Sequence, residues 1–291
     1  MIDLGNQDGR LLVFGGPYSN FAATSAMRRR ARELDVPPRR VICTGDLIAY
    51  CAEPAQTVDL VRDWGIHTVM GNCEESLAFN EADCGCGFDD GSQCSNLALT
   101  WYRYADSRID DTRRHWMQSL PRALEFRVSD RRFRVVHGSL TSINEFVFAS
   151  SDRDAKLAQL RKAGVDAIIG GHSGIPFGQR IGDRYWLNAG VIGMPANDGS
   201  SHGWYLQIEP AEGGPVCSWH SLEYDFRSSR DSAIAAGMPE YGEALASGLW
   251  PSMDVLPEAE RLKRGQPLDL PAMQISAAPA RENNLRKATA F

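Results

Sequence analysis

Residues 40–46, RVICTGD, combine a short apolar run with a glycine turn and a carboxylate, Asp46. The run has the length and composition of a buried strand, and the glycine turn brings Asp46 to the strand's carboxyl end. The same design recurs in three later segments, which end in Asn72, His137 and His172. Open α/β sheets place their active sites at the carboxyl ends of their strands, so the pattern predicts a functional edge.

Helical segments alternate with apolar strands along the chain, which is typical of an α/β fold. Strands are expected at 11–14, 40–44, 66–70, 123–128, 132–137, 167–169, 184–187, 203–209 and 216–223. Helices are expected at 21–34, 54–63, 96–105, 111–120, 153–163, 227–237 and 239–247. The last three strands are expected to form an antiparallel run.

We expect one sandwich domain over 1–222, with the helices of 223–256 packed on it. Residues 80–95 interrupt the alternation, because they are rich in Gly, Asp and Cys and show no periodicity. They are interpreted as an inserted, cysteine-rich loop. Residues 257–291 are polar and aperiodic, and a weakly packed tail is expected there.

The composition is that of an ordinary globular protein: 291 residues, of which 43% are hydrophobic and 23% charged. The formal net charge of −6 gives no overall attraction to nucleic acid or to an anionic membrane. No run reaches the ~20 apolar residues of a membrane span, and the first residues do not resemble a signal peptide. We therefore expect a cytoplasmic protein with mostly reduced cysteines and no nucleic-acid or membrane partner. The oligomeric state is left open.

Asp46, Asn72, His137 and His172 together offer one carboxylate oxygen, one amide oxygen and two imidazole nitrogens. This donor set suits Mn, Fe or Zn. Glycines beside each residue would let the backbone approach a bound ion closely. Taken singly, each histidine could be a hydrogen-bonded core residue, and the other two could be turn formers. Their joint recurrence after strands favours the metal site.

Five segments, in order, resemble the motifs of the calcineurin-like metallophosphoesterases, in the bacterial branch of phosphodiesterases and dinucleoside tetraphosphate hydrolases. They are GDLIAYCAEP (45–54), GNCEE (71–75), VVHGS (135–139), GGHSGIPF (170–177) and LNAGVIGMP (187–195). The resemblance covers roughly 11–210. It implies a four-layer αββα sandwich with a pair of metals at one edge. It also implies that Asp46 bridges the metals and that the other three residues complete the second metal's ligands.

The resemblance breaks down at the first metal. The family opens with Asp-x-His after the first strand, where this chain has Gly16 and Tyr18. The second histidine of the fifth motif is replaced by Gly174. A glycine has no side chain to ligate with, and Tyr18 is a poor substitute. One ion per chain is therefore expected, at the retained site, and two-metal displacement is in doubt.

Three residues are candidates for catalytic roles. Cys73 replaces the family's third-motif histidine, and it could act as an acid, a nucleophile or a soft ligand, or simply fill space. Glu74 is the second candidate, although it could instead complement the dipole of the helix expected there. Asn20 matches an asparagine of the family's first motif and could orient that loop or the phosphate.

Cys84, Cys86 and Cys94 fall in the inserted loop. Their spacing could support a structural zinc or an iron-sulfur centre, but it lacks the paired Cys-x-x-Cys of strong zinc motifs. A reversible thiol pair and unligated thiols are the alternatives. The sulfurs could also rebuild the lost first-metal site, since Cys73 leads directly into this segment.

Two functions remain open at this point. The first is metal-dependent hydrolysis of a small phosphate mono- or diester by metal-activated water at a remodelled, mononuclear site. The second is a non-catalytic protein of the same fold that binds a nucleotide or phosphate, or senses metal or redox state through its cysteines. Retention of the complete second ligand set favours the enzyme.

Overall fold

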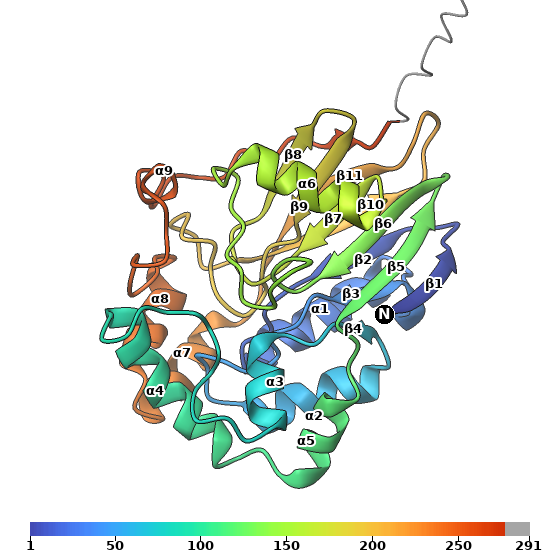
Figure 1. The fold of residues 1–291 in the computed structure, drawn as a ribbon. Coiled ribbons are helices and arrows are strands. Elements are labelled where there is room, and N and C mark those ends of the chain that lie inside the picture. Colours follow the sequence, from blue (N-terminus) through green and yellow to red (C-terminus); the bar gives the residue numbers. More distant parts are fainter. Residues whose placement is uncertain (277–291) are drawn as a thin grey trace, which may run out of the picture.

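A computed structural model describes residues 1–276, in which two sheets pack face to face (Figure 1). Each sheet has six strands. Helix α6 covers the outer face of one sheet, and α1, α2 and the remaining large helices lie against the other sheet or beside it. The layers therefore run helix, sheet, sheet, helix, which is the four-layer α/β sandwich expected from the motifs.

The first sheet has the strand order β1-β5-β6-β7-β9-β8. Its strands are β1 (Ile2–Asn6), β5 (Ala123–Val128), β6 (Arg131–Val136), β7 (Ala167–Gly170), β8 (Phe177–Ile181) and β9 (Arg184–Asn188). The second sheet has the order β12-β11-β10-β2-β3-β4. Its strands are β2 (Leu11–Phe14), β3 (Val41–Cys43), β4 (His67–Thr68), β10 (Gly203–Glu209), β11 (Val216–Leu222) and β12 (Met273–Gln274).

The helices up to residue 247 lie close to the helical segments expected from the sequence, and one short helix lies in the segment expected to be a tail. The helices are α1 (Phe21–Glu33), α2 (Pro54–Trp64), α3 (Asn72–Ala78), α4 (Gln93–Asp106), α5 (Asp111–Gln118), α6 (Arg153–Ala163), α7 (Phe226–Ala235), α8 (Pro239–Ser247) and the short α9 (Glu258–Arg261). A 3-10 turn, η1, spans Pro38–Arg40.

Strand β2 is buried along its whole length because both faces of its sheet are covered. Leu11 and Val13 contact the core between the two sheets, whereas Leu12 and Phe14 contact the helical layer. Successive residues of a strand point to opposite faces, so a strand covered on both sides must be apolar throughout. This explains the unbroken apolar run at 11–14.

The two sheets bring their functional loops to one edge. β2, β3 and β4 are parallel neighbours in one sheet, and β6, β7 and β9 are parallel neighbours in the other. The backbone nitrogen of Gly15, just after β2, donates to the carbonyl oxygen of Gly190 at 2.9 Å and joins the two sets of strand ends. The loops after β3, β6 and β7 therefore converge at this edge.

Three strands occur where the sequence predicted none: β1, β8 and β12. β1 and β8 are the outer strands of the first sheet. An edge strand pairs on one side only and stays partly exposed, so it does not need the apolar run that identifies a central strand. The polar composition of these segments therefore hid them.

The inserted loop is shorter than predicted. Helix α4 begins at Gln93, because the Ser92 side chain accepts a hydrogen bond from the backbone nitrogen of Ser95 and caps the helix. The irregular segment thus ends at 92, and Cys94 belongs to the first turn of α4.

The segment expected to be a weakly packed tail, 257–291, differs from that prediction over the part that the structure describes. β12 pairs antiparallel with β11, and Ile275 is fully buried in the core between the sheets. The Glu260 carboxylate of α9 is also buried and accepts from the backbone nitrogen of Ser150. These contacts join residues far apart in the sequence, which local composition cannot indicate. Residues 277–291 lie outside the described residues.

Within residues 1–276, no helix combines the length and the apolar character that crossing a membrane requires.

Candidate metal centre

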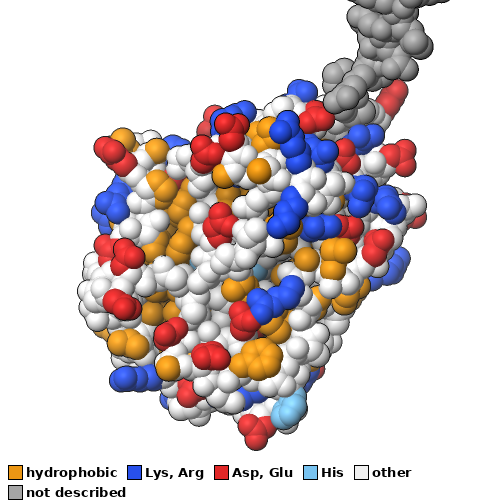
Figure 2. Space-filling model, viewed as in Figure 1, with side chains coloured by type: hydrophobic (Ala, Val, Ile, Leu, Met, Phe, Trp, Pro, Cys, Tyr) orange, Lys and Arg blue, Asp and Glu red, His pale blue; other side chains and the backbone are white. Residues whose placement is uncertain are grey.

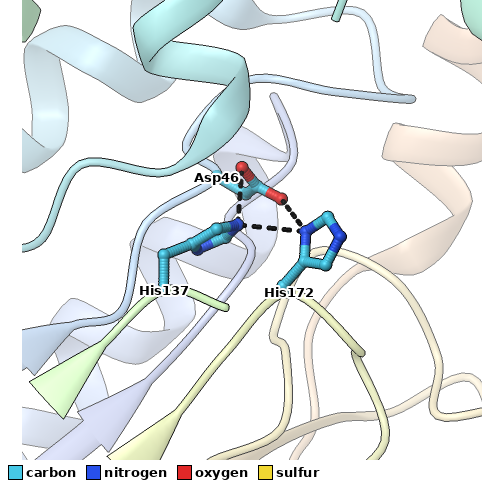
Figure 3. A group of neighbouring side chains, drawn as sticks. All are labelled: Asp46, His137 and His172. Carbon is cyan, nitrogen blue, oxygen red and sulfur yellow. Dashed lines mark hydrogen bonds and ion pairs between the residues drawn. The ribbon is translucent and has the colours of Figure 1, made fainter. Parts of the chain in front are cut away.

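Three buried side chains meet at the edge where the strand ends converge (Figure 3). The Asp46 Oδ1 atom lies 3.2 Å from His137 Nε2, and Asp46 Oδ2 lies 4.0 Å from His172 Nδ1. The two histidine nitrogens are 3.2 Å apart. Each residue follows a strand, β3, β6 or β7, so the parallel pairing of two different sheets delivers all three to one point.

The turns that present these side chains have little room. Asp46 and His172 both have a positive φ, of 57° and 53°, a conformation that non-glycine residues adopt uncommonly. A Cβ atom added to Gly45 would lie 2.9 Å from His137 Nδ1, and one added to Gly71 would lie 2.4 Å from Asp46 Oδ1. Glycine is therefore required at both positions for the loops to approach one another.

The tautomer of His137 is fixed by a backbone carbonyl. His137 Nδ1 lies 2.7 Å from the Thr44 carbonyl oxygen and must donate to it. In the neutral ring, Nε2 then carries a lone pair and faces three more electron-rich atoms, among them Asp46 Oδ1 and His172 Nδ1. Such a group is repulsive unless a proton or a metal ion lies among its members. The Thr44 carbonyl oxygen thus fixes the orientation of the His137 ring, as the hydrogen-bond partner of a metal-binding histidine usually does.

Asn72 completes the group. Its side-chain oxygen lies 3.0 Å from His137 Nε2. Its amide nitrogen donates to the backbone oxygen of Cys84 at 2.9 Å, which fixes the amide with its oxygen toward the centre. The inserted loop thus orients one of the candidate ligands, a contact that sequence reasoning did not predict.

The electrostatics favour the cation-binding forms of Asp46 and His172, whereas they favour the protonated form of His137 when no metal is bound. Burial by itself would raise the pKa of Asp46, but the neighbouring His137 and His172 hold it below its ordinary value, so the carboxylate is ionised. Burial and then the charge of His137 lower the pKa of His172 to about 3, which keeps that ring neutral. Burial would lower the pKa of His137 too, but Asp46 outweighs it and raises that pKa.

The arrangement fits one divalent metal ion. Ligand atoms at about 2.1 Å from a tetrahedral or octahedral ion lie about 3.0–3.4 Å from one another. Asp46 Oδ1, Asn72 Oδ1 and His172 Nδ1 lie 3.0–3.2 Å from His137 Nε2, which agrees with that range. Two imidazole nitrogens and two oxygens suit Mn, Fe or Zn. The four side chains are buried, so an ion among them would be largely shielded from solvent.

Cys73, predicted as a catalytic candidate, is fully buried beside the centre. Its sulfur lies 3.5 Å from the Asn72 amide nitrogen, and its backbone nitrogen donates weakly to Asp46 Oδ1. Burial, followed by the charges of Asp46 and Glu74, raises the pKa of this thiol well above its ordinary value. A neutral, enclosed thiol is a poor nucleophile, so the geometry favours the space-filling alternative.

The contacts of Glu74 favour a positioning role over the catalytic role predicted for it. Its carboxylate is fully buried and accepts hydrogen bonds from the backbone nitrogens of Asp46, Leu47 and Gly71, at 2.7–2.9 Å. Burial and then the charge of Asp46 raise the pKa of Glu74 to about 7. These contacts join the loop after β3 to the turn before α3, which is what a positioning residue would do.

Asn20, the third catalytic candidate, is engaged in the fold. Its side-chain oxygen accepts from the backbone nitrogen of Ala23, which caps α1, and from the Ser229 hydroxyl. Its amide nitrogen donates to the Gly193 carbonyl oxygen and to the Tyr224 hydroxyl. These contacts leave no group for a phosphate and support the loop-orienting alternative.

Aromatic rings fill the side where the family's first metal would lie. A Cβ atom added to Gly16 would come within 2.5 Å of the Tyr18 ring. A Cβ atom added to Gly174 would lie 3.2 Å from Trp250. Tyr18 is itself buried, and burial together with the charge of Asp46 raises its pKa, so it stays a neutral phenol. The residues present do not fit a first metal.

The three cysteines of the inserted segment do not gather into one cluster. Cys84 and Cys86 form a disulfide, and the Cys86 sulfur lies 3.4 Å from the Asn72 amide nitrogen. Cys94 lies apart from them, where its backbone nitrogen faces Asp254. The predicted three-cysteine zinc or iron-sulfur site is therefore not formed in this structure, because two sulfurs are bonded to each other and the third belongs to α4.

Comparison with known proteins agrees with this geometry. The model of the calcineurin-like phosphoesterase superfamily domain matches residues 19–210, about two thirds of the chain. An uncharacterized protein of Methanocaldococcus jannaschii is 24% identical over 256 residues, which cover 82% of this chain and 98% of that protein.

Two solved structures share the fold. A metallophosphoesterase from Sphaerobacter thermophilus has a TM-score of 0.65 at 21% identity, over 84% of this chain and all of that one. A hypothetical protein from Pyrococcus horikoshii has a TM-score of 0.69 at 14% identity, over 84% of this chain and 98% of that one. With its family model matched over most of the sandwich, the chain belongs to the calcineurin-like phosphoesterase superfamily, whose members use divalent metals.

Proposed function

We propose that this protein hydrolyses a phosphate mono- or diester with a single divalent metal ion held by Asp46, Asn72, His137 and His172. The observation that carries the proposal is the convergence of three polar atoms, Asp46 Oδ1, Asn72 Oδ1 and His172 Nδ1, on His137 Nε2. A structural core would pair such acceptors with donors, because unpaired buried polar atoms are costly.

The overall reaction adds water across one phosphoester bond. The oxygen of water bonds to phosphorus, the bond from phosphorus to the ester oxygen breaks, and the alcohol leaves with a proton. A divalent ion, when bound, neutralises charge on the phosphoryl oxygens and makes water a stronger nucleophile. The protein supplies the fixed carboxylate of Asp46 and the oriented rings of His137 and His172.

A cation is needed here because the surroundings are otherwise unfavourable to phosphate. Asp46 is ionised, and the Glu74 carboxylate lies directly behind its loop. Among the described residues that line the adjoining cavity, none is a lysine or arginine. A phosphate could approach only if a metal offset this negative potential.

The test combines metal content and hydrolysis. The purified protein, loaded with Mn, Fe or Zn, is expected to bind about one ion per chain and to hydrolyse p-nitrophenyl phosphate or bis-p-nitrophenyl phosphate. His172→Ala should remove both properties, because it deletes one of the two nitrogen ligands. His115→Ala, on the exposed face of α5, is the matched control.

The possible results of this experiment lead to different conclusions. Full metal content in His172→Ala would overturn the proposed site. One ion per chain without hydrolysis of any phosphoester would instead favour the non-catalytic alternative. That alternative is motivated by the aromatic rings that occupy the first-metal side.

A further inference from the structure

A partly open cavity of about 80 Å³ adjoins the candidate metal centre, and His172 forms part of its wall. The other walls come from separate parts of the chain: Tyr18 and Tyr50 after β2 and β3, Phe146, and Trp250 after α8. Hydrophobic side chains also gather on the left half of the face shown in Figure 2, over the region where α4 and α8 lie in Figure 1.

The aromatic walls are held in place before any ligand arrives. The ring centroids of Tyr18 and Tyr50 are 4.7 Å apart, and those of Tyr50 and Tyr241 are 4.8 Å apart. The Trp250 indole nitrogen donates to the Pro195 carbonyl oxygen at 2.7 Å, and its backbone nitrogen donates to Asn197. The cavity is therefore preformed, as small-molecule sites usually are.

His172 connects the cavity to the metal centre. Its Nδ1 atom faces the centre, while the ring packs on Phe146 with centroids 4.2 Å apart. Two lining residues, Tyr18 and Gly174, occupy the sequence positions where the resemblance places ligands of the first metal. Residues at two of the positions of the lost metal site thus line an aromatic cavity, which shares His172 with the retained ligands.

The side chains that line the cavity determine which chemical groups can bind in it. The described lining residues include no charged side chain other than the titratable His172, so a second phosphate or another ion would lose its hydration without a partner. Flat aromatic groups gain from stacking on aromatic walls as well as from burial. Because His172 serves both sites, a ring that enters the cavity must be joined to the phosphorus by a short link.

Resting on the function proposed above, we propose that this cavity binds the aromatic ester group of the substrate, so that the preferred substrates are aryl phosphoesters. A nucleotide places a ribose between phosphate and base. The base of a nucleotide would therefore lie beyond the cavity, because the cavity begins at His172, which is itself a proposed metal ligand.

Binding of phosphonates, which are not hydrolysed, tests this separately from catalysis. Phenylphosphonate, butylphosphonate, methylphosphonate and a nucleoside monophosphate are titrated into the metal-loaded protein by calorimetry. We expect phenylphosphonate to bind about tenfold tighter than methylphosphonate, with butylphosphonate between them and the nucleotide no tighter than methylphosphonate. Equal binding of phenyl- and methylphosphonate would overturn the proposal, as would preference for the nucleotide.

A variant that fills the cavity provides the second measurement. Val255→Trp places a large ring at a half-buried lining position and should weaken phenylphosphonate binding about tenfold while leaving methylphosphonate binding and metal content unchanged. Leu262→Trp, at an exposed position outside the cavity, is the matched control. Unchanged phenylphosphonate binding in a folded Val255→Trp protein would contradict the assignment.

Phenol separates failure of the cavity from failure of the proposed function, because it lacks a phosphorus group. If the protein takes up no metal but binds phenol in a manner that Val255→Trp abolishes, the cavity assignment stands and the metal proposal fails. If the metal-loaded enzyme hydrolyses phosphoesters but neither phenol nor the phenyl group is favoured, only the cavity assignment fails.

Discussion

The Asn72 amide nitrogen donates to the backbone oxygen of Cys84 at 2.9 Å, so a candidate metal ligand is oriented by the inserted loop. The same amide turns its oxygen toward His137 Nε2. The insertion is therefore part of the support of the centre and not a surface excursion. Because its nitrogen is hydrogen-bonded to the backbone, the Asn72 amide presents its oxygen in one orientation, which is what a metal ligand requires.

Replacing Asn72 should weaken metal binding without unfolding the protein. Asn72→Ala removes one of four ligand atoms, and we expect the metal dissociation constant to rise about 10–100-fold. Competition with a chromogenic zinc chelator measures it. Asn96→Ala, an exposed asparagine in α4, should leave the constant unchanged. Equal affinity in the two variants would show that Asn72 is not a ligand.

The disulfide should affect metal affinity through the same loop. The double variant Cys84→Ser with Cys86→Ser frees the segment whose backbone holds Asn72, and we expect roughly a 3–10-fold loss of metal affinity. Cys94→Ser is the control, because Cys94 lies apart in α4. An effect of Cys94→Ser as large as that of the pair would refute the assigned difference.

Loss of the Glu74 charge should destabilise the fold. Glu74→Gln places an amide among three backbone donors that now share one carboxylate, and we expect the free energy of unfolding to fall by about 2–4 kcal/mol. Urea denaturation at pH 8 measures it. Glu75→Gln, at the neighbouring and more exposed position, should change stability far less, since its partner is the exposed Arg122. Similar losses in both variants would argue against the positioning role.

Lys156 should make stability depend on pH. Its amine is buried in α6 and donates to the carbonyl oxygens of Phe148 and Ala149, and burial lowers its pKa from 10.5 to about 8. The folded state therefore binds fewer protons than the unfolded state between these two values. The contribution of Lys156 to stability is complete above pH 10.5 and is lost as the pH falls toward 8.

Unfolding free energies of the wild type and Lys156→Met, measured between pH 7 and 10, test this sign. The wild type should gain on the variant as the pH rises above 8. Lys162→Met, an exposed position on the same helix, should show no such trend. A constant difference across the range would contradict the lowered pKa.

Restoring a histidine at position 174 should not restore a second metal. Gly174 has a φ of +71°, and a Cβ atom there meets Trp250 at 3.2 Å. We expect Gly174→His to lose about 1–3 kcal/mol of stability and to bind no more than one ion per chain. Gly182→His has a similar φ, +65°, but nothing within 4 Å, so it isolates the backbone effect from the crowding. Two ions per chain in Gly174→His would refute the interpretation.

Much of the architecture could be predicted because it depends on patterns within single short segments of the sequence. The apolar run at 11–14 identifies a strand covered on both faces, and glycine turns place Asp46 and His172 directly after their strands. Parallel pairing then brings such residues to one edge. Chain order and periodicity place each candidate ligand at a strand end, but the meeting of Asp46 with His137 and His172 also requires the two sheets to pack face to face.

The remaining features depend on contacts between distant segments. Glu74 was predicted to be catalytic because only its position beside Asn72 was visible, whereas its three backbone donors come from packed loops. The disulfide partner of Cys86 was likewise open to several choices, and β12 lies in a segment for which a weakly packed tail was expected. Periodicity specifies which face of an element is buried. It does not specify what lies against that face, and the packing of Trp250 beside Gly174 is decided only when the whole chain has packed.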